Sequence, residues 1–413
     1  MTIRRLCTLV PFRSAVFSAL GAVFLIGLAS AQDLGEQQGI PVGEGQIYPS
    51  IRIDYQSNDN VGLTADDELD GDATIIQPEF VFIADSRNLV FQAGYAGVYS
   101  LGSVGPLEWD DHELSAGLAA EFDARRRADV DFSVSRQHTD LGAGLTRGLG
   151  NDLDEPVVFD VVQLNAAFGY GVADALGNVT AGVRFQTQNY ANLDQVTDGY
   201  GFSEVRPYAR FGYRIGGDSR FLAEIRASFL EFDLASRSRD ELAVLFGLGF
   251  TATGRLSGSF NIGFENVDFS TAGQENTTLF VVESNLRYQP TSFALFTLDV
   301  SRGINNTGLG LVAGGSGESI ETVVRLGWEH DWSSRFSSKA FVEADLDDEI
   351  CPTITDSTLS AGLEIGLAVR RWLEIGAGFS SASRDTDSCT VGDGAETLSY
   401  DRQLVGVHLR ATL

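Results

Sequence analysis

The chain has 413 residues and a formal net charge of -28, with 57 acidic and 29 basic residues. This excess of acid argues against nucleic-acid binding, which relies on clustered lysine and arginine. The mean hydropathy of -0.00 argues against a helical membrane protein, but it is compatible with a membrane barrel, in which apolar and polar positions alternate.

The N-terminus is predicted to be a secretory signal peptide spanning residues 1–31. It contains, in order, a basic start (Arg4, Arg5 and Arg13), an apolar stretch (Ala15 to Leu28) and a cleavage site of small residues (Ala29-Ser30-Ala31). The apolar stretch is too short for a stable membrane span. We expect residues 32–46 to form a periplasmic N-terminal segment and residues 47–413 to form one membrane domain.

After the signal, the chain repeats a unit of roughly twenty residues, in which about ten alternating positions precede a connection. One example has Val179, Ala181, Val183 and Phe185 on one face and Thr180, Gly182, Arg184 and Gln186 on the other. Alternation at every second residue indicates a strand, because a helix would repeat at three and four. The segments centre near Ile53, Phe80, Ala93, Leu118, Phe132, Leu164, Val183, Ala209, Ile225, Phe246, Phe260, Val282, Leu298, Val324, Ala340, Leu363, Ile375 and Val407.

Short and long connections alternate between these segments. The short ones are Asp85-Ser86-Arg87, Ala124-Arg125-Arg126, Thr253-Gly254 and Arg370-Arg371. The long ones span 57–72, 140–155, 305–317, 350–357 and 383–397, and the glycine-rich stretch 140–155 is the candidate for constricting the lumen. This alternation is typical of periplasmic turns and extracellular loops.

The last segment has one apolar face, formed by Val405, Val407, Leu409, Ala411 and Leu413. Its other face carries His408 and Arg410, so it is predicted to close a barrel against the segment around Ile53, with the apolar face toward lipid. The fold expected is therefore all-β: a transmembrane, up-and-down, antiparallel β-barrel of about eighteen strands, with sixteen as the alternative count. The expected location of the protein is the bacterial outer membrane, with both termini in the periplasm.

The first segment, Pro49 to Leu63 (PSIRIDYQSNDNVGL), resembles the opening motif of the putative β-barrel porin 2 family. That family starts with a Pro-Ser strand followed by a Tyr-x-x-Asn-Asp-Asn-Val type loop. Weaker likenesses lie at Gln77-Pro78, Leu89 to Tyr99 and His112 to Phe122. The resemblance implies an outer-membrane barrel, and some members are associated with exopolysaccharide biosynthesis and export. Leu413 departs from the terminal phenylalanine that the barrel assembly machinery expects.

Cys351 and Cys389 are the two cysteines outside the signal peptide, and they fall in neighbouring long loops. Because an exported chain folds in an oxidising compartment, they are predicted to form a disulfide that stiffens the mouth. Closing this loop would contribute roughly 3–4 kcal/mol.

Charged residues on the predicted lumen faces form two sets. A basic ladder comprises Arg184, Arg206, Arg210, Arg214 and Arg226, and an acidic wall comprises Glu113, Glu121, Asp129 and Asp131. Two interpretations stay open. The sets could create a transverse field that favours anions, or the arginines could simply pair with Glu224, Glu231 and other lumen acids.

Motifs for catalysis and cofactors are scarce. Acidic runs such as 66–72 do not have the spacing of a calcium loop, and no metal site or cofactor is predicted. His138, with Asp140 and Ser135, is the only group that resembles part of a hydrolytic site. Four tryptophans, Trp109, Trp328, Trp332 and Trp372, lie near strand ends, where interfacial belts form.

The function expected is that of a non-enzymatic outer-membrane channel, serving exopolysaccharide export or the passive diffusion of anions and other small solutes. A structural or adhesive surface barrel with a plugged lumen is the alternative, and an outer-membrane hydrolase is a remote one. The partners expected are outer-membrane lipid, lipopolysaccharide and the barrel assembly machinery. The transported solute and the oligomeric state stay open.

Overall fold

The computed structural model describes residues 39–412 except for 151, 173–174, 218, 251–254, 271–275, 306–318, 350–353 and 389–397. Cys351, Cys389, Leu413 and the predicted signal peptide lie outside the described residues. No helix in the described ranges has both the length and the apolar character needed to cross a membrane.

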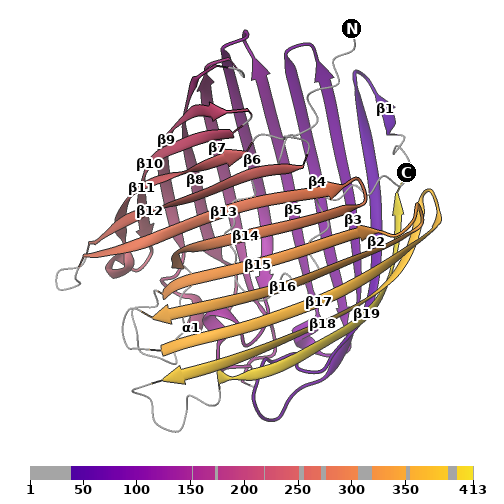
Figure 1. The fold of residues 1–413 in the computed structure, drawn as a ribbon. Helices are drawn as coiled ribbons and strands as arrows, with labels where there is room; N and C mark the ends of the chain where they lie inside the picture. The colour runs from indigo at the N-terminus through magenta and orange to yellow at the C-terminus, as the bar shows by residue number, and fades with distance from the viewer. Residues whose placement is uncertain are drawn as a thin grey trace.

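Almost all of the described chain is β-strand (Figure 1). The strands are β1 (Ile40–Val42), β2 (Gly45–Asn58), β3 (Gly71–Ser86), β4 (Leu89–Gly102), β5 (Trp109–Glu121), β6 (Arg126–Thr139), β7 (Val157–Tyr170), β8 (Gly177–Tyr190), β9 (Phe202–Gly216), β10 (Ser219–Phe232), β11 (Arg239–Phe250), β12 (Leu256–Phe269), β13 (Thr277–Thr291), β14 (Ala294–Asn305), β15 (Ser319–Asp331), β16 (Phe336–Glu349), β17 (Ile354–Arg370), β18 (Leu373–Ser388) and β19 (Tyr400–Thr412). Short helical turns lie in the connections: η1 (Gly105–Leu107), η2 (Gly144–Thr146), α1 (Asp194–Thr197) and η3 (Ala235–Arg237).

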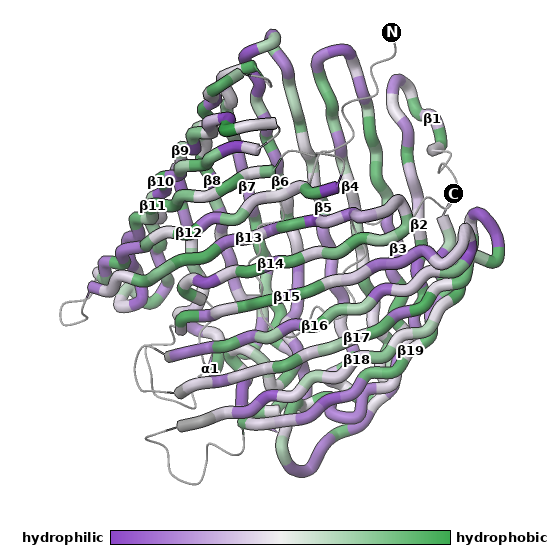
Figure 2. Tube along the Cα trace, viewed as in Figure 1, coloured by the Kyte–Doolittle hydropathy of each residue, from purple (hydrophilic) through white to green (hydrophobic). Residues whose placement is uncertain are grey.

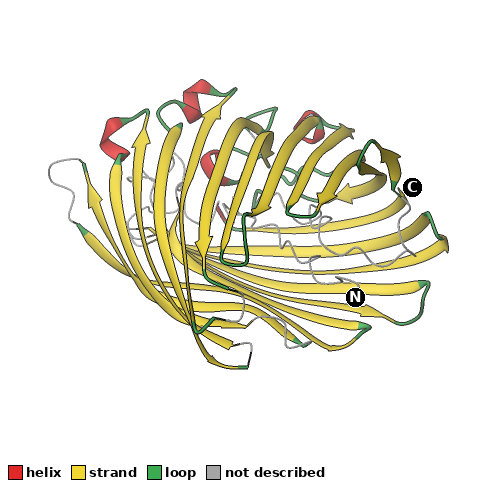
Figure 3. Cartoon of the chain, turned by 90° about the horizontal axis from the view of Figure 1, so that it is seen from above, coloured by secondary structure: helices red, strands yellow, loops and turns green. Residues whose placement is uncertain are grey.

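Strands β2 to β19 form a closed antiparallel barrel. Each pairs with the next in the chain, and β19 closes the ring by pairing with β2. Figure 3 shows the strands following one another around an elongated wall. The closing register sets Leu409 opposite Ile53. The prediction of an eighteen-strand barrel is confirmed, and each predicted centre lies within one of these strands.

The short strand β1 continues the sheet where β19 stops. Thr412 pairs with Ser50, and Ile40 to Val42 pair with Ile47 to Gly45 on the same edge of β2. β1 therefore pairs with the backbone groups at the start of β2 that β19 does not reach. This pairing shortens the exposed edge of β2.

The predicted alternation sets the two faces of the wall. On β19, Val407 is 56% exposed on the outer face, whereas the adjacent His408 is 5% exposed on the lumen face. Figure 2 shows apolar and polar residues alternating along the strands. Outward apolar side chains occur on most of the ring, as expected of a wall that faces lipid.

Several strands are longer than the ten residues predicted. β17 begins at Ile354 and β18 runs to Ser388, so parts of the predicted loops 350–357 and 383–397 are strand. Apart from Ile354, the added residues are polar on both faces, for example Asp385 and Thr386, so no apolar periodicity marks them as strand. Pairing with the neighbouring strand extends them instead.

The barrel has two dissimilar ends, which we call the turn end and the loop end. Tight connections such as 87–88 and 122–125 lie at the turn end, together with the first residues of β2 and the last of β19. The loop end carries the longer connections, including 59–70, 140–156 and 191–201. The predicted alternation of connection length is therefore confirmed among the described connections.

Three of the four tryptophans match the predicted belt. Trp332 and Trp372 are exposed at the turn end, and Trp328 on the outer face stacks on His330 and meets Trp332 edge-on. Trp109 does not match, because it lies on the lumen side of β5 and stacks on His138 with ring centroids 3.7 Å apart. Its position at a strand end did not reveal which face it occupies.

Candidate functional site

The five arginines of the predicted ladder lie on the lumen faces of β8, β9 and β10. Arg184 pairs in register with Arg206, and Arg210 with Glu224. Arg214 pairs with Arg220, and Arg226 with Tyr208. The two-residue strand period places all of them on one sector of the wall.

Arg206, Arg210 and Arg226 each have an acidic partner. Arg210 lies 2.5 Å from Glu224, Arg206 lies 2.6 Å from Glu204, and Arg226 lies 2.5 Å from Glu283. This arrangement favours lumen ion pairing over an uncompensated basic ladder. Arg184 differs, since no ion pair to it is found among the described residues.

The acidic wall lies beside the arginines and not across the lumen from them. Glu113 and Glu121 occupy the lumen face of β5, and Asp129 and Asp131 that of β6. A single row of paired residues runs from Asp131 through Asn165 to Arg184. A transverse field between the two predicted sets therefore does not follow from their positions, because only β7 separates their strands.

The most pronounced feature of the lumen is the connection between β6 and β7, residues 140–156, which we call the inward loop. It reaches the other side of the ring, where Arg147 forms an ion pair with Asp356 on β17. Its first residue, Asp140, accepts a hydrogen bond of 3.0 Å from Arg402 on β19. The candidate constriction indicated by glycine content and length thus folds into the barrel.

Several side chains of the inward loop are buried. Leu141, Ala143, Leu145 and Thr146 are buried, and Ala143 belongs to one hydrophobic cluster with Leu63, Ala382 and Tyr400. Hydrophobic burial and the two ion pairs together hold the loop against the wall formed by β17, β18 and β19.

Glycine makes the close approach of two loops feasible. A Cβ atom at Gly142 would lie 2.0 Å from the backbone oxygen of Gly62, and one at Gly150 would lie 1.9 Å from it. Gly142 also has a φ of 78°, which disfavours other residues. The inward loop therefore rests directly on the β2–β3 connection.

His138 anchors the start of the inward loop. Its Nδ1 lies 3.0 Å from both carboxylate oxygens of Asp111, and its Nε2 lies 3.5 Å from Asp140. Burial favours the neutral form of Asp140, but the adjacent His138 ring and the Arg402 guanidinium outweigh it and hold the pKa of this carboxyl below its ordinary value.

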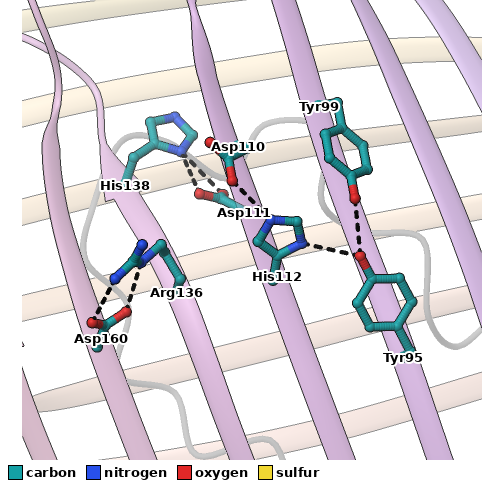
Figure 4. A network of polar contacts seen from close by, with 8 residues as sticks. All are labelled: Tyr95, Tyr99, Asp110, Asp111, His112, Arg136, His138 and Asp160. Carbon is teal, nitrogen blue, oxygen red and sulfur yellow. Dashed lines mark hydrogen bonds and ion pairs between the residues drawn. The ribbon is translucent and has the colours of Figure 1, made fainter.

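These contacts give His138 a structural role. Figure 4 shows it directed toward Asp111. The Ser135 hydroxyl, which would be the nucleophile of the remote hydrolase alternative, accepts a hydrogen bond from Gln137 at 2.9 Å. No contact joins Ser135 to His138 among the described residues, so the pair has no nucleophile–base geometry.

The same view includes polar side chains on the outer face of β4 to β7 (Figure 4). His112 bonds Asp110 at 2.8 Å and the Tyr95 hydroxyl at 3.0 Å. Arg136 makes two hydrogen bonds to Asp160, at 2.8 and 2.9 Å. These residues lie toward the loop end, above the apolar band.

The lumen is filled at the loop end and more accessible toward the turn end. Lumen-facing Gln186, Gln188, Arg239 and Arg402 are buried near the loop end. Toward the turn end, Gln92, Glu121, Asp131 and Asn285 are exposed. Not all of the filling is polar, since Leu245, Val267 and Val281 make an apolar lumen cluster on β11 to β13 that alternation alone assigned to the polar face.

Sequence reasoning missed the residues that hold the inward loop. Arg147, Asp356 and Arg402 come from distant parts of the chain, and no local spacing joins them. The only available signal was that Arg147 lies in the loop proposed to constrict the lumen. Among the described residues, no group of three or more His, Cys, Asp and Glu side chains is placed to hold a metal ion.

Solved outer-membrane proteins resemble the chain at low sequence identity. The outer membrane protein OpdK of Pseudomonas aeruginosa has a TM-score of 0.46 and 9% identity, covering 89% of this chain and 99% of its own. OccAB4 of Acinetobacter baumannii has a TM-score of 0.47 and 9% identity, covering 92% of this chain and 99% of its own. No curated protein matches the chain.

The family comparison agrees with the opening motif at Pro49 to Leu63. The model of the family described as putative beta-barrel porin 2 matches residues 33–413, which include every described strand. With the closed barrel and its outward apolar face, this match identifies the chain as a member of the putative beta-barrel porin 2 family, a porin-like barrel of the outer membrane.

Proposed function

We propose that this protein is a passive outer-membrane channel whose conductance is limited by the inward loop. The observation that carries the proposal is the ion pair between Arg147 and Asp356, which ties the loop to the wall on the other side of the ring. A loop held in this way narrows the loop end while leaving water-exposed charged residues toward the turn end.

Planar-bilayer recordings of the purified full-length protein test the proposal. We expect small, stable conductance steps from the wild type. Replacing residues 141–149 with a short glycine-serine linker should give larger steps, because the mouth is then unobstructed. A folded barrel that conducts in neither form would contradict the proposal, and heat-modifiable migration on gels would establish folding.

The solutes proposed are small anions and other small polar molecules. Arg184, Arg206 and Arg226 line one sector of the lumen, and Arg184 has no ion pair among the described residues. Export of an exopolysaccharide is a second proposal, which rests on the family resemblance alone. Deletion in the native host should reduce secreted polysaccharide if export is the role, and should reduce solute uptake if diffusion is.

A structural or adhesive barrel with a plugged lumen is the alternative function. The burial of Gln186, Gln188 and Arg239 at the loop end favours it, since filled lumens need not conduct. In that case the linker variant should lose surface binding, and neither it nor the wild type should conduct.

Further proposals concern the chain's placement and covalent state. We propose cleavage after Ala31, periplasmic termini at the turn end, a disulfide between Cys351 and Cys389, and contact of the outer face with lipopolysaccharide. Assembly would depend on the barrel assembly machinery.

A further inference from the structure

Buried donors without hydrogen-bond partners gather beneath the inward loop. Arg384 on β18 is 2% exposed, and its Nε donates to the Leu398 carbonyl at 2.8 Å. Among the described residues, neither Nη1 nor Nη2 of Arg384 has a hydrogen-bond partner, and the same holds for Arg147 Nε and the Tyr400 hydroxyl. A buried donor without a partner is costly, so such a group in a native protein calls for a missing acceptor.

Nearby carboxylates do not serve as that acceptor. Asp356 binds Arg147 through Oδ2 and accepts from the Thr386 hydroxyl at 2.5 Å through Oδ1. Asp347 accepts from Ser319 at 2.7 Å. The guanidinium of Arg384 instead lies over the Tyr400 ring, with Cζ 4.6 Å from its centroid. This contact leaves the in-plane N–H groups free to bind an oxygen ligand.

The strand register places a further hydrogen-bond acceptor, Asp345, in line with Arg384 and Tyr400. Asp345 pairs with Thr358, Thr358 with Arg384, and Arg384 with Tyr400, so the four lumen-facing residues cross four adjacent strands. With neighbouring strands about 4.8 Å apart, Asp345 lies about 10 Å from Arg384 along the wall. One carboxylate oxygen of Asp345, Oδ1, is also buried and has no hydrogen-bond partner in the part of the chain that the structure describes.

We propose that Arg384, Tyr400 and Arg147 form an oxyanion-binding subsite of the channel, with Asp345 accepting hydrogen bonds from hydroxyl groups of the same ligand. The guanidinium groups and the phenol supply donors for a carboxylate, and the distance to Asp345 matches a ligand of about one sugar unit. The ligand class is therefore a polyhydroxy carboxylate, such as an acidic sugar. If the subsite selects the solutes that pass through the barrel, that role rests on the proposed channel function.

Isothermal titration calorimetry on the full-length protein in detergent tests the subsite without requiring conductance. The probes are D-glucuronate, glucose and acetate at constant ionic strength. We expect glucuronate to bind more tightly than acetate and glucose to give no signal. Arg384→Gln should weaken glucuronate binding about tenfold or more, as expected for loss of a charged hydrogen bond.

Two further variants make the test specific. Tyr400→Phe removes one hydroxyl, keeps the ring, and should weaken binding less than Arg384→Gln. It also provides a test if Arg384→Gln fails to fold. Arg410→Gln, on the lumen face of β19 near its turn end, is the matched control and should bind like the wild type.

The failure of the subsite can be told apart from failure of the channel. No glucuronate binding by the wild type, or equal binding by the wild type, Arg384→Gln and Tyr400→Phe, would overturn the subsite even if the protein conducts. Equal affinity for acetate and glucuronate would overturn the role of Asp345. A protein that binds glucuronate through Arg384 and yet never conducts would overturn the channel and leave the subsite standing.

Discussion

At the scale of single residues, burial decides which ion pairs matter. The side chains of Arg147 and Asp356 are 10% and 2% exposed, whereas those of Arg136 and Asp160 are 49% and 44% exposed. Removing one partner of a buried pair costs about 3–5 kcal/mol, because the other charge stays buried. An exposed pair contributes roughly 0–1 kcal/mol. The loop is therefore held by few residues.

We predict that Asp356→Ala releases the inward loop and increases single-channel conductance, because Arg147 loses its buried partner. Planar-bilayer recordings measure the effect. Asp160→Ala, which breaks the exposed Arg136 pair on the outer face, is the matched control and should leave conductance unchanged. Equal conductance in all three proteins would show that the Arg147 pair does not hold the loop.

The pH dependence of loop docking follows from Asp140. Its lowered pKa means that the folded state gains stability at every pH above the ordinary carboxyl pKa of about 3.9. That gain is lost as the pH falls from there through the lowered value. We expect constant conductance from pH 7 to about 5 and an increase only below about 4. Asp140→Asn should already show increased conductance at pH 7.

At the scale of elements, the closing seam is the contact on which the barrel depends. β19 pairs with β2 over the register Leu404–Asn58 to Thr412–Ser50. Outward side chains on both strands are apolar, so a slip by one residue would turn them into the lumen. Burial of the apolar band in lipid therefore specifies the register.

We predict that cysteines at Val407 and Tyr55, which are register partners, form a disulfide that seals the seam. Paired residues in an antiparallel ladder have Cα atoms about 4.5–5.5 Å apart, within the range a disulfide spans. In a background lacking the native cysteines, the oxidised protein should resist unfolding by heat in SDS. Cysteines at Val407 and Ile51 are out of register and should not cross-link.

At the scale of the whole molecule, the two ends of the barrel differ in kind. The loop end is packed with the inward loop and buried lumen side chains, while the turn end has tight connections and both ends of the described chain. In bacterial outer-membrane barrels the longer loops face the outside. A narrowed, stiff mouth at the loop end would then meet the environment first.

We predict that a cysteine at Glu68, in the β2–β3 connection of the loop end, reacts with a membrane-impermeant maleimide on intact cells. A cysteine at Asn88, in the tight turn between β3 and β4, should react only after the outer membrane is permeabilised. The reverse pattern would show the opposite orientation of the barrel. Both residues are exposed, so accessibility of the side chain is matched.

Local sequence patterns predicted where the strands lie better than they predicted where each strand ends. The apolar repeat located each strand from β2 to β19, because lipid requires an apolar outer side chain at every second residue. It did not locate the strand ends near Ile354 and Ser388, where both faces are polar. There the pairing of neighbouring strands, and not burial, extends the sheet.

The candidate site was predicted only in outline. Length and glycine content identified residues 140–155 as the candidate constriction, and this loop folds into the barrel. The residues that receive it, Asp356 and Arg402, carried no signal, since their partners lie 209 and 262 residues away in the chain. The arginine ladder was located on the correct face, yet its neutralisation by Glu204 and Glu283 depended on register across strands.

The sequence by itself determined that this chain is a barrel of alternating strands, and which face of each strand meets lipid. That information is local, because it depends only on the two-residue strand period and the solvent on each side. Only the tertiary structure decided which lumen charges are paired, where the inward loop docks and which donors stay unpaired beneath it. Those outcomes depend on ring closure, which brings residues from distant strands within contact distance.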